Sequence, residues 1–125
     1  MAQLKYADIT GKVLGAAFEV HSFLGNGFQE VIYQRALAFE MGCAGLSFAR
    51  ELEQPIFYKE LTEPIGTRRV DFLVEEKVLV EIKAVTEILP VHWAQLLNYL
   101  KAYHLEVGLL LNFGTSSLTY KRMVR

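Results

Sequence analysis

The feature that most constrains the fold is a pair of strongly apolar segments, Arg68–Val74 and Val78–Ala84, separated by three charged residues at 75–77. β-Branched and aromatic residues dominate both segments, which is typical of strands. A charged triplet between two such segments predicts a hairpin with a three-residue loop. The chain is therefore expected to form a sheet in which one face of this hairpin is buried.

Side chains alternate along a strand, so the hairpin has two faces. With the triplet as the loop, Val74 lies opposite Val78 and Asp71 lies opposite Glu81. One face is then entirely apolar and is expected in the core: Val70, Phe72, Val74, Val78, Val80 and Ile82. The other face carries Arg69, Asp71, Leu73, Leu79, Glu81 and Lys83, with Arg69 opposite Lys83. A two-residue loop would instead place Asp71 opposite Val80 and separate the acids.

The polar face has two interpretations. Opposed carboxylates repel each other by about 4 kcal/mol at 4 Å and an effective dielectric constant near 20, so a positive group must offset them. Lys83 supplies part of that charge, and a divalent cation would supply more, because hard cations prefer carboxylate oxygens. The alternative is a solvent-exposed face on which Arg69, Asp71, Glu81 and Lys83 form salt bridges.

The rest of the chain predicts helices before and after these strands in the sequence. Apolar residues at helical spacing predict helices over 6–23 and 29–41, and Pro90 begins a third helix that reaches about Tyr103. The second helix is expected to pack through Phe28, Ile32, Ala36 and Phe39.

Further short apolar segments predict the remaining strands, at 46–50, 54–59, 107–113 and 118–124. Pro55 indicates that its strand lies at an edge or starts late. The predicted order is α-α-β-β-β-β-α-β-β, a mixed α/β (α+β) fold.

Length and composition favour a single cytoplasmic domain. The chain has 125 residues, of which 52% are hydrophobic, so one domain over residues 1–125 with one core is expected. No apolar run approaches the roughly 18 residues that cross a bilayer, and the first ten residues lack the apolar segment of a signal peptide. The formal net charge of −1 argues against a strong general nucleic-acid binder, although a local basic patch suffices for binding.

Two further segments place polar residues at regular spacing. In GFQEVIY, Glu30 falls in the first turn of a helix, where the helix dipole favours a carboxylate. In the third helix, His92, Gln95 and Tyr99 form a polar stripe beside the packing face. Each segment alone also fits an ordinary helix start or a solvated helix face. His21 is interpreted as a helix-end or core residue.

Together these segments resemble the GxxExxY proteins, a branch of the PD-(D/E)xK nuclease superfamily. GFQEVIY contains the GxxExxY signature, VDFLVEEKVLVEIK contains the D…ExK pattern of the superfamily, and QLLNY resembles its Q-x-x-x-Y element. The resemblance extends from about Ile9 to Val124. One departure is Val70, which precedes Asp71 where proline is common.

The resemblance implies a restriction-endonuclease-like core, with a mixed central sheet flanked by helices, and a metal-dependent nuclease that hydrolyses DNA or, alternatively, RNA. It implies Mg²⁺ as the cofactor, with Mn²⁺ as a substitute. The implied metal ligands are Glu30, Asp71, Glu81 and the backbone carbonyl of Ile82. Lys83 would be the catalytic lysine, and Gln95 and Tyr99 would position the substrate or the nucleophile.

Other functions stay open at this point. Many members of this branch have no assigned activity, so a catalytically silent module of the same fold that binds nucleic acid or a protein partner is the main alternative. A third hypothesis uses the same metal site on a smaller phosphate-containing substrate. Small nucleases of the superfamily often dimerise to cover a duplex, so a homodimer is also expected.

Overall fold

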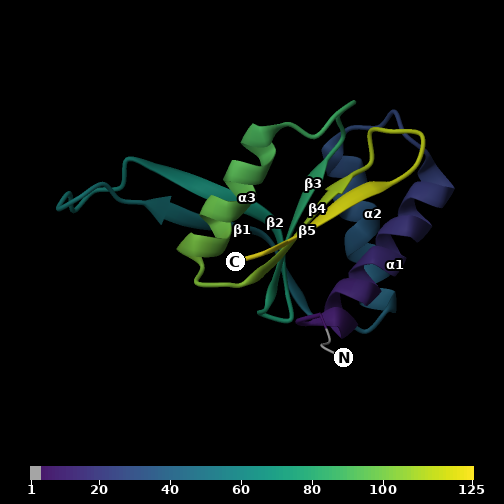
Figure 1. Ribbon diagram of the computed structural model, residues 1–125, viewed down its shortest axis with the longest axis horizontal. Helices are drawn as coiled ribbons and strands as arrows, with labels where there is room; N and C mark the ends of the chain where they lie inside the picture. Colours follow the sequence, from purple (N-terminus) through teal and green to yellow (C-terminus); the bar gives the residue numbers. More distant parts are fainter. Residues whose placement is uncertain (1–3) are drawn as a thin grey trace.

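A computed structural model describes residues 4–125, in which three helices surround one sheet (Figure 1). Residues 1–3, which belong to the predicted domain and to the N-terminal segment expected to lack a signal peptide, lie outside this range. The elements are α1 (Ala7–Leu24), α2 (Glu30–Cys43), β1 (Phe48–Ile56), β2 (Gly66–Val74), β3 (Val78–Lys83), α3 (Pro90–Ala102), β4 (Val107–Asn112) and β5 (Thr119–Val124). None of the helices within residues 4–125 has the length and apolar character needed to cross a membrane.

The sheet has five strands in the order β1-β2-β3-β4-β5. Neighbouring strands are antiparallel except β3 and β4, which are parallel and are connected through α3. Helices α1 and α2 cover one face of the sheet, and α3 covers the other (Figure 1). The predicted mixed sheet flanked by helices is confirmed.

The two faces of the sheet bury two separate hydrophobic clusters. The larger cluster joins α1 and α2 to alternate residues of β2, β3 and β4, such as Phe72, Val80 and Leu109. The smaller cluster joins Leu96 and Leu100 of α3 to the residues on the opposite face. Close approach of α3 depends on Gly108, because a Cβ there would lie 3.0 Å from the Leu96 side chain.

The predicted hairpin register is confirmed where the strands pair. Val74 pairs with Val78, Leu73 with Leu79 and Phe72 with Val80. The ladder between β2 and β3 ends there, so the predicted pairings of Asp71 with Glu81 and of Arg69 with Lys83 are not part of it. Beyond this point β2 continues alongside β1 alone.

The apolar face of the hairpin is buried as predicted, but it does not form one core. Phe72 belongs to the cluster under α1 and α2, whereas Val70 packs in the cluster under α3. Asp71 lies between these two residues. On the neighbouring strand β1, the residue opposite Asp71 is Glu51, which has a left-handed backbone conformation with φ 55°. We attribute the change of face to this irregularity, which lies between the ladder pairs Arg50–Phe72 and Leu52–Val70.

Two predictions about the first half of the chain are wrong. The strands predicted at 46–50 and 54–59 are one strand, β1, so the order is α-α-β-β-β-α-β-β. Pro55 lies in this edge strand, as predicted. The buried residues of α2 are Tyr33, Gln34, Leu37 and Met41, whereas Phe28 and Phe39 of the predicted packing face are exposed.

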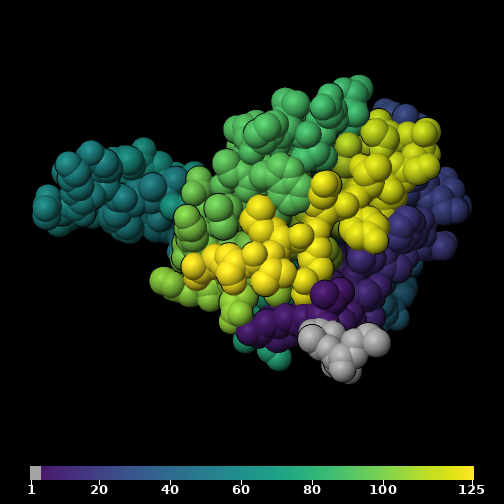
Figure 2. All heavy atoms as spheres, viewed as in Figure 1, coloured from purple at the N-terminus to yellow at the C-terminus, as the bar shows by residue number. Residues whose placement is uncertain are grey.

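The hairpin of β1 and β2 projects from the body of the protein as an arm, which we define as residues 52–70. Figure 2 shows it as a teal extension on the left of the molecule. The loop that closes the arm exposes Phe57, Tyr58, Leu61 and Ile65. The base of the arm lies beside α3.

Candidate functional site

Where the ladder between β2 and β3 ends, the carboxylates of Asp71 and Glu81 accept hydrogen bonds from the backbone of the neighbouring strand. The backbone N–H of Asp71 donates to Oε1 of Glu81 at 3.1 Å, and the backbone N–H of Ile82 donates to Oδ2 of Asp71 at 2.7 Å. Each acid thus replaces a backbone carbonyl that the neighbouring strand no longer supplies. The arrangement holds the two carboxyl groups together at the edge of the paired region.

A residue that the sequence interpretation missed fixes one of these acids. Gln34 of α2 is only 6% exposed, and its Nε2 donates to Oδ1 of Asp71 at 2.8 Å. Together with the Ile82 N–H, it gives each oxygen of the Asp71 carboxylate a donor. Its spacing of four residues from Glu30 on the same helix was the available signal.

Glu81 lies in a strongly unfavourable environment for a negative charge. Its side chain is 8% exposed, and burial, followed by the charge of Asp71, raises its pKa to about 8. The hydrogen bond from the Asp71 backbone and the charge of Lys83 act in the opposite direction, and the charge of Glu30 adds to the increase in pKa. Near neutral pH this carboxyl holds a proton unless a cation compensates its charge.

Glu30 is held at the start of α2 by a tight preceding loop. Gly25 and Gly27 have φ values of 70° and 110°, which glycine adopts without strain. The hydroxyl of Tyr33 donates to the Gly25 carbonyl at 2.6 Å and accepts the Phe28 N–H at 3.2 Å. Tyr33 is fully buried, so the tyrosine of GxxExxY serves the loop structurally.

The Glu30 carboxyl lies within the electrostatic field of the acid pair. Burial raises its pKa, the charge of Lys83 lowers it, Asp71 raises it and His92 lowers it. His92 stands in the first turn of α3, and its Nδ1 accepts the N–H of Leu89 at 2.9 Å. α2, β3 and α3 therefore all contribute charge to one region.

The structure brings two of the predicted metal ligands into contact. Within residues 4–125, no three His, Cys, Asp or Glu side chains are arranged to hold a metal ion. Asp71 and Glu81 fit a cation in their chemistry, since they are close, partly buried and mutually repulsive. Glu30 is near enough to affect their charges but does not complete a three-carboxylate cluster.

The other predicted site residues lie around this pair. Lys83 is half-buried, and no salt bridge involves it within the described chain. Tyr99 is half-buried, and its pKa is raised by burial and then by the charge of Glu81. Gln95 is exposed on the same helix. His21, interpreted as a helix-end or core residue, is buried, and its Nε2 lies 3.0 Å from the Thr115 carbonyl oxygen.

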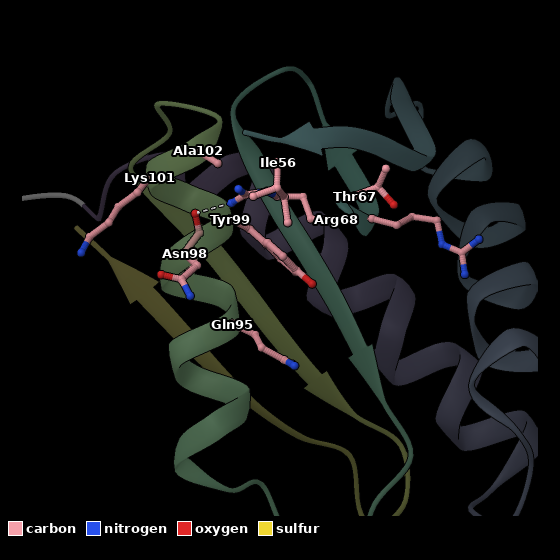
Figure 3. Close-up of a pocket in the computed structure, with 9 residues that line it drawn as sticks. Ile56, Thr67, Arg68, Gln95, Asn98, Tyr99, Lys101 and Ala102 are labelled. Carbon is pink, nitrogen blue, oxygen red and sulfur yellow. Dashed lines mark hydrogen bonds between the residues drawn. The ribbon is translucent and has the colours of Figure 1, made fainter. Parts of the chain in front are cut away.

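A cavity of about 660 Å³ lies between the base of the arm and α3. Figure 3 shows its lining residues, which come from β1, β2 and α3. Its lining includes Arg68, Arg69, Gln95, Asn98, Tyr99 and Lys101. Two of the predicted site residues, Gln95 and Tyr99, therefore line a cavity that lies within the electrostatic reach of the acid pair.

Comparison with known proteins identifies the family and the fold. The sequence profile of the PD-(D/E)XK nuclease superfamily matches residues 7–123. A comparison with curated proteins gives no match. The crystal structure of SSO0001 is similar, with a TM-score of 0.51 and 18% sequence identity over 94% of this chain and 77% of that chain. At this identity the likeness concerns the fold alone, and it agrees with the predicted restriction-endonuclease-like arrangement.

Proposed function

This chain belongs to the PD-(D/E)XK nuclease superfamily, and from this premise we propose that it is a divalent-metal-dependent nuclease that hydrolyses phosphodiester bonds in DNA. Nucleases of this superfamily act on nucleic acid and generally use divalent metals. The observation that supports the proposal is the braced pair of Asp71 and Glu81, with Lys83 two residues beyond Glu81. We also propose that the chain is one domain of the GxxExxY branch, because Gly27, Glu30 and Tyr33 match its signature.

The acid pair would hold the metal. Asp71 and Glu81 would bind Mg²⁺, or Mn²⁺ in its place, and Glu30 and the Ile82 carbonyl would complete the set directly or through water. A bound cation of this kind lowers the pKa of a coordinated water and neutralises charge on the phosphate. Metal binding requires Glu81 to release the proton that its environment favours.

The protein's own side chains would orient the reacting groups. Gln34 and the Ile82 N–H fix the Asp71 carboxylate, so its free lone pairs have one orientation. The Lys83 ammonium forms no salt bridge within residues 4–125 and is free to orient a water or stabilise the negative charge that develops on the phosphate. Gln95 and Tyr99 would position the substrate from α3.

Cleavage by the purified protein tests the proposal. DNA should be cleaved with Mg²⁺ or Mn²⁺, and Glu81→Ala or Lys83→Ala should abolish cleavage because each removes a group at the reacting centre. Glu19→Ala, an exposed position on α1, is the matched control and should cleave like the wild type. Cleavage that survives in both site variants would point to a contaminant and contradict the assignment. RNA of the same sequence decides between the two substrates.

A catalytically silent module that binds nucleic acid or a protein is the second candidate. It is favoured by the lack of a three-ligand group among residues 4–125 and by the net charge of −1. Calorimetric titration with Mn²⁺ distinguishes the nuclease from the silent module. A nuclease should bind Mn²⁺, and the Asp71→Asn variant should no longer bind it. A homodimer that covers a duplex stays a prediction, which the mass of the protein in solution tests.

A further inference from the structure

The cavity between the arm and α3 has a charge unlike that of the whole protein. The chain has a net charge of −1, whereas the lining contains three cationic side chains and, within the described residues, no carboxylate. Arg68 and Arg69 come from β2 and form no salt bridge within residues 4–125. The Lys101 side chain extends away from Arg68, at the rim (Figure 3). The positive charge of the cavity is therefore concentrated on the arm side.

Arg68 is held in place with unused hydrogen-bond donors. One terminal nitrogen donates to the Asn98 carbonyl of α3 at 3.4 Å, which is a long bond (Figure 3). Its Nε is buried and has no hydrogen-bond partner among the described residues. The same is true of Oε1 of Gln54, the residue that pairs with Arg68 across β1 and β2, so the Nε faces the arm and not a ligand in the cavity. Within the described chain the terminal nitrogens of Arg68 make only the one long bond, and the planar fork of arginine suits phosphate.

The cavity lies near the acid pair but does not include its carboxylates. Arg68 precedes Asp71 by three residues on β2. Tyr99 lines the cavity, and its hydroxyl group experiences the charges of Glu81, Arg68 and Asp71. A nucleic-acid strand bound at the acid pair would therefore place another of its backbone phosphates near the two arginines.

We propose that this cavity binds a backbone phosphate of the nucleic-acid strand, beside the phosphate at the acid pair, with Arg68 as its principal ligand. The identity of the ligand rests on the proposed function. Arg69 and the amides of Gln95 and Asn98 supply further donors on the two walls. The volume of about 660 Å³ leaves room for a sugar-phosphate unit, because small-molecule pockets span about 300–1,000 Å³.

Binding without metal tests this proposal separately from catalysis. The probes are a fluorescently labelled single-stranded DNA, its duplex and the RNA of the same sequence, measured by anisotropy with a chelator present. Arg68→Gln should weaken binding about 10-fold, as expected for a lost charged hydrogen bond. It should also reduce the slope of log affinity against log salt by about 0.7 for single strands or about 0.9 for duplex. Arg68→Lys should keep the slope and lose part of the affinity.

Two controls make the result specific to the cavity. Lys12→Gln removes the same charge from an exposed position on α1, across the sheet, and should leave affinity and slope unchanged. The second control replaces one backbone phosphate of the probe at a time by an uncharged methylphosphonate. The wild type should bind more weakly when one particular phosphate is replaced. For Arg68→Gln, replacement of that phosphate should have no additional effect on affinity.

The proposal is overturned if Arg68→Gln binds like Lys12→Gln, if no methylphosphonate position depends on Arg68, or if the wild type binds none of the three probes. Loss of binding in Arg68→Gln supports it even if the protein cleaves nothing, whereas cleavage alone decides the nuclease assignment.

Discussion

Glu81 is the residue on which the chemistry of the site depends. Its buried carboxyl lies against Asp71, and no described cation neutralises the pair directly. The register that brings the two acids together followed from the length of the charged loop and the alternation of the strands. The spacing of Gln34 from Glu30 was a signal for its side of the helix, but its hydrogen bond to Asp71, 37 residues away in the sequence, could not be predicted.

Without metal, the protein should lose stability as pH rises through the range in which Glu81 titrates. The pKa of Glu81 is raised from 4.5 to about 8, so between these values the folded state keeps a proton that the unfolded state has released. The stabilising contribution is complete below about 4.5 and is lost as pH rises through about 8. The unfolding free energy should fall by up to about 1.4 kcal/mol per pH unit from this group.

Glu81→Gln should remove this pH dependence, because the amide mimics the protonated acid. Chemical denaturation with a chelator at several pH values between 5 and 8 measures it, with the exposed Glu19→Gln as the matched control. The same pH slope in Glu81→Gln and the wild type would contradict the raised pKa.

Gln34→Ala should weaken metal binding without removing a ligand. The amide orients Asp71, and residues that support metal ligands typically contribute 10–100-fold in affinity. Calorimetric titration with Mn²⁺ measures the effect. Arg35→Ala, the exposed neighbour on the same helix, should bind metal like the wild type, and an unchanged affinity in Gln34→Ala would show that Asp71 needs no support.

At the scale of elements, α2 shows why hydrophobic periodicity was ambiguous. Tyr33, Leu37 and Met41 form one stripe at helical spacing, and Ile32, Ala36 and Phe39 form another. Both satisfy the pattern, and only the packing of α2 against α1 and the sheet selects the first. The left-handed Glu51 was equally hidden, because nothing in the residue type predicts φ 55°.

Tyr33→Phe should destabilise the loop that presents Glu30. The ring would still stack on Phe113 at 4.6 Å between centroids, but the Gly25 carbonyl and Phe28 N–H would lose their shared partner. The expected loss is about 1–3 kcal/mol of unfolding free energy, with reduced cleavage. Denaturant unfolding measures the first and the DNA assay the second.

Tyr120→Phe is the control, because Tyr120 is 44% exposed and makes an edge contact with Phe18 away from the loop. Equal stability of both variants would mean that the Tyr33 hydroxyl does not hold the loop.

On the scale of the whole molecule, the mixed sheet flanked by helices was expected from the family resemblance, whereas the order of the strands within the sheet was not predicted. The arm could not be predicted, because it depends on the part of β2 before Phe72 pairing with β1 alone and not with β3. That divergence has two consequences. The backbone N–H of Asp71 is left without a backbone partner on β3 and donates to the Glu81 carboxylate instead, and the basic cavity lies between the arm and α3. One departure from regular pairing thus places an acidic site and a basic site next to each other.

A crystal structure of the protein soaked in Mn²⁺ tests the central claim most directly. Anomalous density should mark an ion bound by carboxylate oxygens of both Asp71 and Glu81, with Glu30 bound directly or through water. An acid pair that stays empty at a saturating concentration, or Mn²⁺ bound elsewhere while Glu81 keeps its hydrogen bond to the Asp71 N–H, would contradict the metal-dependent nuclease.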